Sequence, residues 1–109
     1  CRNVSNEYDL IIAVANWPRP RREVFRTLLR ARAMENLSYV IGVNRVGEDP
    51  NRLVYSGDSV IIDPRGKALV EAEEGADTVI TATLDYAPLQ DLRQKFPVWA
   101  DADPFLLQI

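Results

Sequence analysis

The sequence contains no histidine and only one cysteine, Cys1, among its 109 residues. Without histidine, this chain cannot supply an imidazole base or an imidazole metal ligand. A single cysteine excludes an internal disulfide and a cysteine-based metal cluster within the chain, and a free thiol fits a reducing compartment. We therefore expect neither a metal ion nor an organic cofactor.

Long hydrophobic runs are also absent. No apolar stretch approaches the roughly 20 residues of a membrane-spanning helix, and the first residues lack the pattern of a signal peptide. The formal net charge of −3 gives no reason to expect nucleic acid or an anionic membrane as a partner. Hydrophobic residues make up 47% and charged residues 27%, which is typical of a globular protein. We expect a soluble, cytoplasmic protein with one small domain.

Two apolar segments flank a helical segment in the first half of the chain. Tyr8–Ala15 (YDLIIAVA) and Ser38–Val46 (SYVIGVNRV) are nearly continuous apolar runs, typical of parallel strands covered on both faces. Arg21–Asn36 has apolar residues spaced three and four apart, which predicts an amphipathic helix with an apolar face of Val24, Phe25, Leu28, Leu29 and Ala31. The pattern predicts a βαβ unit and an α/β fold class.

The second half is more irregular in pattern. We expect a polar loop over Gly47–Ser59, then a hairpin of Val60–Asp63 and Ala68–Glu73 around the turn PRGK. Alternation over Thr78–Asp85 predicts another antiparallel strand, and Pro88–Lys95 predicts a short helix that Asp85 can cap. The apolar, proline-containing tail FPVWADADPFLLQI matches no regular element. Neither an internal repeat nor a second domain is evident.

Polar and aromatic residues follow both predicted parallel strands. In open α/β sheets, ligands bind beyond the carboxyl ends of such strands. These ends carry Asn16 and Trp17 after the first strand and Asn44 and Arg45 after the second. The carboxamide of Asn16 donates and accepts hydrogen bonds, and Trp17 offers an apolar wall. A ligand-binding corner and a purely structural turn both fit these residues.

Arginines recur at every fourth position of the predicted helix, at Arg22, Arg26 and Arg30. A solvated helix surface is the preferred interpretation, since charged residues of a helix usually face water. An anion-binding surface is the alternative.

The end of the same helix carries a polar group of residues. Arg32 and Glu35 are three positions apart and can form an ion pair. Asn36 is a suitable terminator because asparagine tolerates the left-handed conformation. We favour a polar network that supports the following strand, and a buried Glu35 acting as a general base is the alternative.

Cys1 carries the only thiol of the sequence and is therefore the obvious candidate for a catalytic nucleophile. It precedes the polar stretch RNVSNE and has neither a histidine partner nor a glycine-rich turn or helix start that would lower its pKa. We interpret it as uninvolved in catalysis.

Three segments together resemble one enzyme family in order and over nearly the whole chain. They are ANWPRPRREVFRTLLRARAMENLSYVIGVNRVG, YSGDSVIIDPRGK and LRQKFPVWADAD. The chain resembles the carbon–nitrogen hydrolase (nitrilase) superfamily, and most closely its omega-amidase branch, which acts on 2-oxoglutaramate and similar ω-amides. The RA-x-EN…N and GDS-x-IIDP-x-G blocks carry the likeness to the superfamily, while ANWP and FPVWADAD carry the likeness to this branch.

The resemblance implies which part of such an enzyme the chain represents. Family members use a Glu base, a Lys that stabilises the oxyanion and a Cys nucleophile in a segment of the type CYDLRFPVW, followed by one residue and Arg-Asn. Here Arg2 and Asn3 directly follow Cys1. Cys1 then occupies the position just after the nucleophile segment, and all three catalytic groups precede these residues. Residues 1–109 are expected to be the C-terminal portion of a single domain, and inactive alone.

The resemblance also implies a fold and partners. The fold is a four-layer α-β-β-α sandwich with a mixed sheet, of which this chain supplies part of one half. Asn16 and Trp17 are the expected substrate-binding residues, whereas Arg32, Glu35, Asn36 and Asn44 match positions that are mainly architectural. The helical segment belongs to the face through which family members dimerise, and the tail with Trp99, Phe105 and Leu106 suits packing across a subunit boundary. We expect a small amide substrate and a homodimer.

Two alternatives from other functional classes stay open. One is a non-catalytic α/β module that binds a partner through its tail and its arginine-rich helix. The other is a pseudoenzyme subunit that pairs with an active protomer. Because part of a sandwich would leave a sheet edge bare, we also expect poor solubility of this chain alone unless a companion segment covers it.

Overall fold

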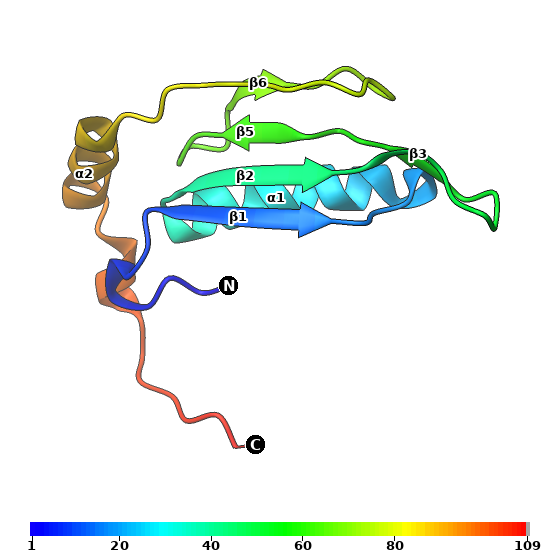
Figure 1. Ribbon diagram of the computed structural model, residues 1–109. Helices are drawn as coiled ribbons and strands as arrows, with labels where there is room; N and C mark the ends of the chain where they lie inside the picture. Colours follow the sequence, from blue (N-terminus) through cyan, green and yellow to red (C-terminus); the bar gives the residue numbers. More distant parts are fainter. Residues whose placement is uncertain (109) are drawn as a thin grey trace.

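A mixed β-sheet with one long helix on one face forms the body of the protein (Figure 1). The structure is a computed structural model that describes residues 1–108. The sheet has the strand order β1-β2-β5-β6. Its strands are β1 (Leu10–Ala15), β2 (Tyr39–Asn44), β5 (Val60–Ile62) and β6 (Ala68–Glu71). The pair β1–β2 is parallel and the other pairs are antiparallel, which confirms the expected α/β class with a mixed sheet.

Helix α1 (Arg22–Asn36) connects the two parallel strands, as predicted, after a short 3₁₀ turn, η2 (Arg19–Arg21). The buried residues of α1 that form the core, Phe25, Leu29 and Ala33, pack against Val40, Val60 and Ile62 of the sheet. Of the predicted apolar face, Val24 and Leu28 remain 44% and 42% exposed. The buried stripe therefore repeats every four residues, and it is narrower than the pattern suggested.

Gly42 allows α1 to approach β2 closely. A Cβ atom at this position would lie 2.3 Å from Cδ1 of Leu29 and 3.3 Å from Cζ of Phe25. A larger residue would force the helix away from the sheet, because the core is close-packed. Glycine at this position therefore sets the distance between the two layers.

The end of α1 differs in one detail from the prediction. The left-handed residue is Leu37, with φ of 43°, and not Asn36, which is the last helical residue. The carboxamide of Asn36 is used elsewhere: its Oδ1 accepts the N–H of Asn3 at 2.9 Å and its Nδ2 donates to the carbonyl of Arg32 at 2.9 Å. Arg32 and Glu35 form the expected ion pair. The predicted polar network at this helix end is thus confirmed.

The segment predicted as a polar loop contains most of a hairpin. Strand β3 (Val46–Glu48) pairs with β4 (Val54–Ser56) in a separate two-stranded sheet. Oδ1 of Asp49 accepts the N–H groups of Asn51 and Leu53 at 2.9 and 3.0 Å and so closes the turn. The loop prediction for Gly47–Ser59 is therefore wrong for residues 47–48 and Val54–Ser56, which form strands too short to show alternation, and correct for residues 49–53 and 57–59. The hairpin of β5 and β6 is confirmed.

The expected strand over Thr78–Asp85 is not formed. Its alternation survives in the burial, since Ile80, Ala82 and Leu84 are half-buried while Thr81 and Thr83 are exposed. The segment runs from the β6 side of the sheet towards α2 without pairing to a neighbouring strand (Figure 1). Alternation predicts which side chains face the protein, but it does not supply a partner strand.

Helix α2 (Tyr86–Lys95) lies at the amino ends of β1 and β2 and begins two residues before the predicted start (Figure 1). Asp85 is its N-cap residue but makes no side-chain capping bond; its carbonyl accepts the hydroxyl of Tyr39 at 2.8 Å instead. The guanidinium of Arg93 donates to the carbonyls of Leu37 and Tyr8 at 3.0 and 2.9 Å and pairs with Asp9 at 2.5 Å. Arg93 therefore ties α2 to both parallel strands.

The face of the sheet opposite α1 is open along β1. Ile12 and Val14 on this face are 61% and 81% exposed, whereas Ile11, Ala13 and Ala15 pack against the core below α1. β1 is also the last strand of the sheet on its side. This open apolar face is what the expected half of a sandwich would present.

The segments near the two chain ends meet beside the amino ends of the strands, while the C-terminal tail runs away from the body of the protein (Figure 1). They carry two short 3₁₀ segments, η1 (Val4–Asn6) and η3 (Val98–Asp101). The expectation that the tail from Phe96 onward has no regular element is wrong for Val98–Asp101, which forms η3, and is confirmed for residues 102–108. Ile109 lies outside the described residues. Within the described part of the chain, none of the helices is long and apolar enough to cross a membrane.

Replacing Arg93 with Gln is expected to lower the free energy of unfolding by about 2–4 kcal/mol, because buried carbonyls lose charged donors. Lys95→Gln is the matched control, since Lys95 is exposed in the same helix and, among residues 1–108, forms an ion pair with Asp91 alone. It should change stability by less than about 0.5 kcal/mol. Urea denaturation of both variants measures the difference, and equal effects would contradict the role assigned to Arg93.

Candidate functional site

The carboxyl ends of the two parallel strands meet at one corner of the sheet. Ala15, the last residue of β1, is in register with Asn44, the last residue of β2. Asn16 and Trp17 follow β1 directly, so the structure brings together the polar residues that sequence analysis placed at these strand ends. This corner lies where α/β sheets commonly bind ligands.

Asn44 binds both backbone groups of Trp17. Its Oδ1 accepts the N–H of Trp17 at 2.8 Å, and its Nδ2 donates to the carbonyl of Trp17 at 3.0 Å. The backbone of Asn44 is held in turn by Ser59, whose hydroxyl accepts the N–H of Asn44 at 3.0 Å and donates to its carbonyl at 3.3 Å. A buried side chain therefore continues the pairing of β1 and β2 beyond the end of the ladder.

The indole of Trp17 packs inward against the core. Its ring centroid lies 5.8 Å from that of Phe25, and its Nε1–H donates to the carbonyl of Arg21 at 2.7 Å. The guanidinium of Arg21 lies 4.7 Å from the centroid of the same ring, within the range of a cation–π interaction. The side chain of Asn16, by contrast, is exposed. The two predicted substrate-binding residues thus have different environments.

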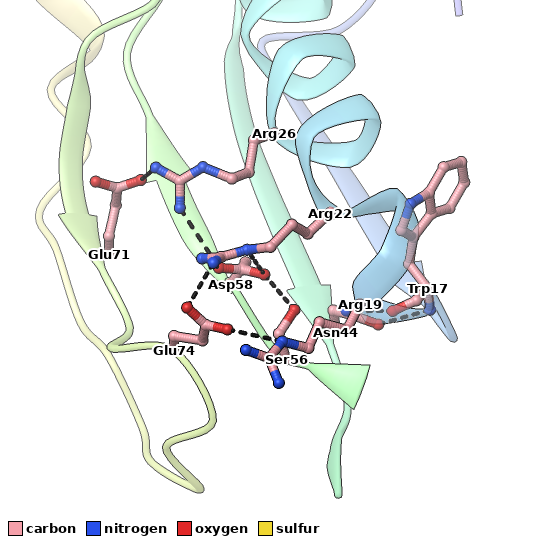
Figure 2. Close-up of polar contacts among 9 residues, drawn as sticks. All are labelled: Trp17, Arg19, Arg22, Arg26, Asn44, Ser56, Asp58, Glu71 and Glu74. Atoms are coloured by element: carbon pink, nitrogen blue, oxygen red, sulfur yellow. Dashed lines mark hydrogen bonds and ion pairs between the residues drawn. The ribbon is translucent and has the colours of Figure 1, made fainter. Parts of the chain in front are cut away.

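A charged cluster lies beside this corner and is centred on Asp58, which is only 3% exposed (Figure 2). Its Oδ1 pairs with Nη2 of Arg22 at 2.5 Å and with Nη1 of Arg26 at 3.4 Å. Its Oδ2 accepts hydrogen bonds from Nε of Arg22 at 3.2 Å and from the hydroxyl of Ser56 at 2.5 Å. The carboxylate thereby joins the start of α1 to the loop between β4 and β5.

Two further carboxylates extend the cluster (Figure 2). Glu74, after β6, pairs with Arg19 at 3.1 Å and with Arg22 at 2.5 Å, and Glu71 of β6 pairs with Arg26 at 3.1 Å. The predicted solvated stripe is therefore wrong for Arg22 and Arg26, whose anionic partners belong to the protein itself. Arg30 alone of the three is exposed.

The environment of Asp58 acts on its ionisation in opposite directions. Burial is the largest influence and raises its pKa, but the hydrogen bonds from Arg22 and Ser56 and the positive charges of Arg22 and Arg26 together lower the pKa below its usual value. The same hydrogen bond from Arg22 to Asp58 raises the pKa of Arg22. Both groups are therefore charged at neutral pH.

The other candidate residues of the sequence are not gathered at this corner. Glu35 is exposed and paired with Arg32, so it is not a buried base. Cys1 is an exposed free thiol near the chain end. Within residues 1–108, no group of three or more acidic, histidine or cysteine side chains is placed to bind a metal ion.

A cavity of about 800 Å³ lies at the other end of the molecule, between the two terminal segments. Residues 2–6, 35–37 and 98–105 line it, including Trp99 and Phe105 of the tail. Arg2 lies 5.9 Å from the ring centroid of Phe105. The cavity lies at the amino ends of the strands, away from the corner formed by Asn16, Trp17 and Asn44.

A family model described as carbon-nitrogen hydrolase matches residues 2–94, which is most of the chain. The chain belongs to the carbon–nitrogen hydrolase family. The resemblance seen in the sequence is thereby confirmed, and so is the nitrilase-like fold class.

Relatives of this hydrolase chain include named amidases. Omega-amidase YafV of Escherichia coli is 50% identical over 102 residues, covering 94% of this chain and 40% of that protein. The 2-oxoglutaramate amidase of Bacillus subtilis is 36% identical over 95 residues, covering 85% of this chain and 35% of that protein. The hydrolase chain thus spans about 40% or less of the length of these relatives.

A solved structure of a CN-hydrolase superfamily protein from Xanthomonas campestris superposes on the hydrolase chain with a TM-score of 0.89 and 47% identity. The superposition covers 94% of this chain and 38% of the other. The similar Nit3 of Saccharomyces cerevisiae, a nitrilase superfamily member, gives a TM-score of 0.77 at 27% identity. The sheet, α1 and α2 are therefore arranged as in the nitrilase superfamily.

Replacing Asp58 with Asn is expected to lower the free energy of unfolding by about 2–4 kcal/mol at neutral pH, because Arg22 loses its buried partner. The stabilisation from Asp58 is present above its unfolded pKa of about 4 and is lost as pH falls through its lower folded pKa. The wild-type protein should therefore lose more stability than Asp58→Asn on acidification from about pH 6 to about pH 3.

Urea denaturation across this pH range measures both effects. Glu74→Gln is the matched control, since Glu74 is an exposed member of the same cluster, and it should cost less than about 1 kcal/mol. Identical pH profiles for the wild-type protein and Asp58→Asn would contradict the lowered pKa.

Proposed function

We propose that residues 1–109 are the C-terminal portion of a single carbon–nitrogen hydrolase domain, and that the whole protein hydrolyses the C–N bond of small ω-amides of the 2-oxoglutaramate type. The observation that carries this proposal is the 50% identity to an omega-amidase over 94% of the chain. The relative named 2-oxoglutaramate amidase supports the choice of substrate. The short coverage of the relatives supports the assignment to one portion of a longer domain.

In this proposal the reacting groups are a Glu, a Lys and a Cys that precede Cys1. The Cys thiolate attacks the amide carbonyl, and the Lys and backbone N–H groups stabilise the oxyanion of the tetrahedral intermediate. The C–N bond breaks as the leaving nitrogen takes up the proton that the Glu removed from the thiol, so ammonia departs and a thioester forms. Water activated by the Glu then cleaves the thioester and releases the carboxylic acid and the free thiol.

Asn16 and Trp17 are the proposed substrate-binding residues. Support comes from their position beyond the carboxyl ends of β1 and β2, where Asn16 lies on the open face of the sheet and Trp17 on the α1 side. The exposed carboxamide of Asn16 is free to hydrogen-bond a polar substrate, and the half-buried Trp17 supplies a stiff apolar wall. No metal or organic cofactor takes part in this scheme.

We further propose a cytoplasmic homodimer that uses the outer face of α1 and the tail. Val24 and Leu28 of α1 are partly exposed, and Phe105 and Leu106 of the tail are 57% and 94% exposed. Apolar side chains exposed on α1 and on the tail favour association with a second chain. The single free thiol of Cys1 is compatible with a reducing compartment.

Release of ammonia from 2-oxoglutaramate tests the proposed activity. The intact gene product that contains this chain is expected to turn over the amide, and the 109-residue chain alone is expected to release no ammonia above background. Turnover by the 109-residue chain would contradict the placement of the nucleophile. A catalytically inert intact product would instead favour a non-catalytic interaction module or a pseudoenzyme subunit.

Light scattering of the intact product tests the proposed dimer. A mass of two chains is expected, and Leu28→Glu should shift the population towards the monomer because it puts a charge into an apolar contact. Leu69→Glu is the control, since Leu69 is similarly exposed on β6, outside α1 and the tail. A monomeric wild-type protein would refute the homodimer.

A further inference from the structure

We propose that Asn44 is a positioning residue for substrate binding, which directs the carboxamide of Asn16 by holding the backbone of Trp17. The inference rests on the proposed substrate role of Asn16 and adds to it a residue that need not touch the substrate. Three independent features of the corner support it.

The first feature is that Asn16 lies between two fixed points of the backbone. Ala15 before it is paired in register with Asn44. Trp17 after it has both its N–H and its carbonyl bound by the carboxamide of Asn44, at 2.8 and 3.0 Å. A single residue between two such anchors has little freedom in φ and ψ, so the direction of its Cα–Cβ bond is set by its neighbours.

The second feature is the side to which Asn16 points. Ile12, Val14 and Asn16 are exposed in alternation, while Ile11, Ala13, Ala15 and Trp17 pack against the core on the α1 side. The strand period of two thus continues for two residues beyond the end of β1. Asn16 therefore belongs to the open face, and Trp17, with its indole N–H bonded to Arg21, acts as the anchor on the opposite side.

The third feature is that the carboxamide of Asn44 suits this contact better than a carboxylate or an apolar group. It must donate to one group and accept from another, which a carboxamide does and an ionised carboxylate or an apolar side chain cannot. A carboxylate would face the carbonyl oxygen of Trp17 with no proton to donate. Asn44 is itself 9% exposed and held by Ser59, so its side chain is fixed before any ligand arrives.

Steady-state kinetics of the intact gene product with 2-oxoglutaramate test the inference. Asn44→Asp should raise KM about fivefold to tenfold, the effect of losing one oriented hydrogen bond to the substrate, while kcat changes less. Ser59→Ala is a milder variant that loosens Asn44 and should raise KM in the same direction. If Asn44→Asp does not fold, the KM of Ser59→Ala tests the inference alone.

Asn36→Asp is a closely matched control. Asn36 is 6% exposed, and its carboxamide also accepts one backbone N–H and donates to one backbone carbonyl, but at the amino end of β2. This variant should lower the melting temperature as Asn44→Asp does and leave KM within about twofold, because it removes the same kind of hydrogen bonds far from the corner.

A double-mutant comparison separates the inference from the proposed function. If Asn44 acts through Asn16, Asn16→Ala raises KM alone, and adding Asn44→Asp or Ser59→Ala raises it no further. Two results would overturn the inference and leave the role of Asn16 intact. In one, the increases in KM from Asn16→Ala and Asn44→Asp multiply in the double mutant. In the other, Asn44→Asp lowers the fraction of active enzyme but leaves KM unchanged. An unchanged KM in Asn16→Ala would refute the substrate role of Asn16 itself, and the inference with it.

Discussion

Close packing of α1 on β2 is the constraint on which the rest of the chain depends. The helix can rest on the strand because Gly42 presents no side chain to Leu29 and Phe25. This contact aligns β1 and β2 in parallel, so that their carboxyl ends meet at Ala15 and Asn44. It also places Arg22, at the start of the helix, within reach of Asp58. The corner formed by Asn16, Trp17 and Asn44 and the charged cluster are thus consequences of one helix–strand contact.

The regular elements could largely be predicted from the sequence, because their signals are local. Continuous apolar runs identified β1 and β2, and apolar spacing identified α1. Prediction failed where the outcome depended on partners. Thr78–Asp85 alternates as a strand does but pairs with none, and β3 and β4 pair although each is too short to alternate. Leu37 takes the left-handed position after the last helical residue, Asn36, whose side chain binds Asn3 and Arg32.

The candidate site was predictable in position but not in detail. Strand ends gave the location of Asn16, Trp17 and Asn44, since the ends of parallel strands meet. The binding of Trp17 by Asn44 spans 27 positions, and the pairing of Arg22 with Asp58 spans 36. Rules based on the spacing of residues in the sequence do not cover such separations. The alternation from Ile12 to Asn16 is one of burial and not of residue type, so the continuous apolar run could not assign Asn16 and Trp17 to opposite faces.

The chemistry of the groups around the corner has a consequence for regulation by acidity. Asn44, Ser59 and Trp17 do not titrate near neutrality, Asp58 releases its proton more readily than usual, and Arg22 retains its proton more firmly than usual. With no histidine in the chain, the corner keeps one protonation state from mildly acidic to mildly alkaline solution. This corner is thus a frame of constant charge near neutrality, whose hydrogen bonds do not change with the acidity of the solution.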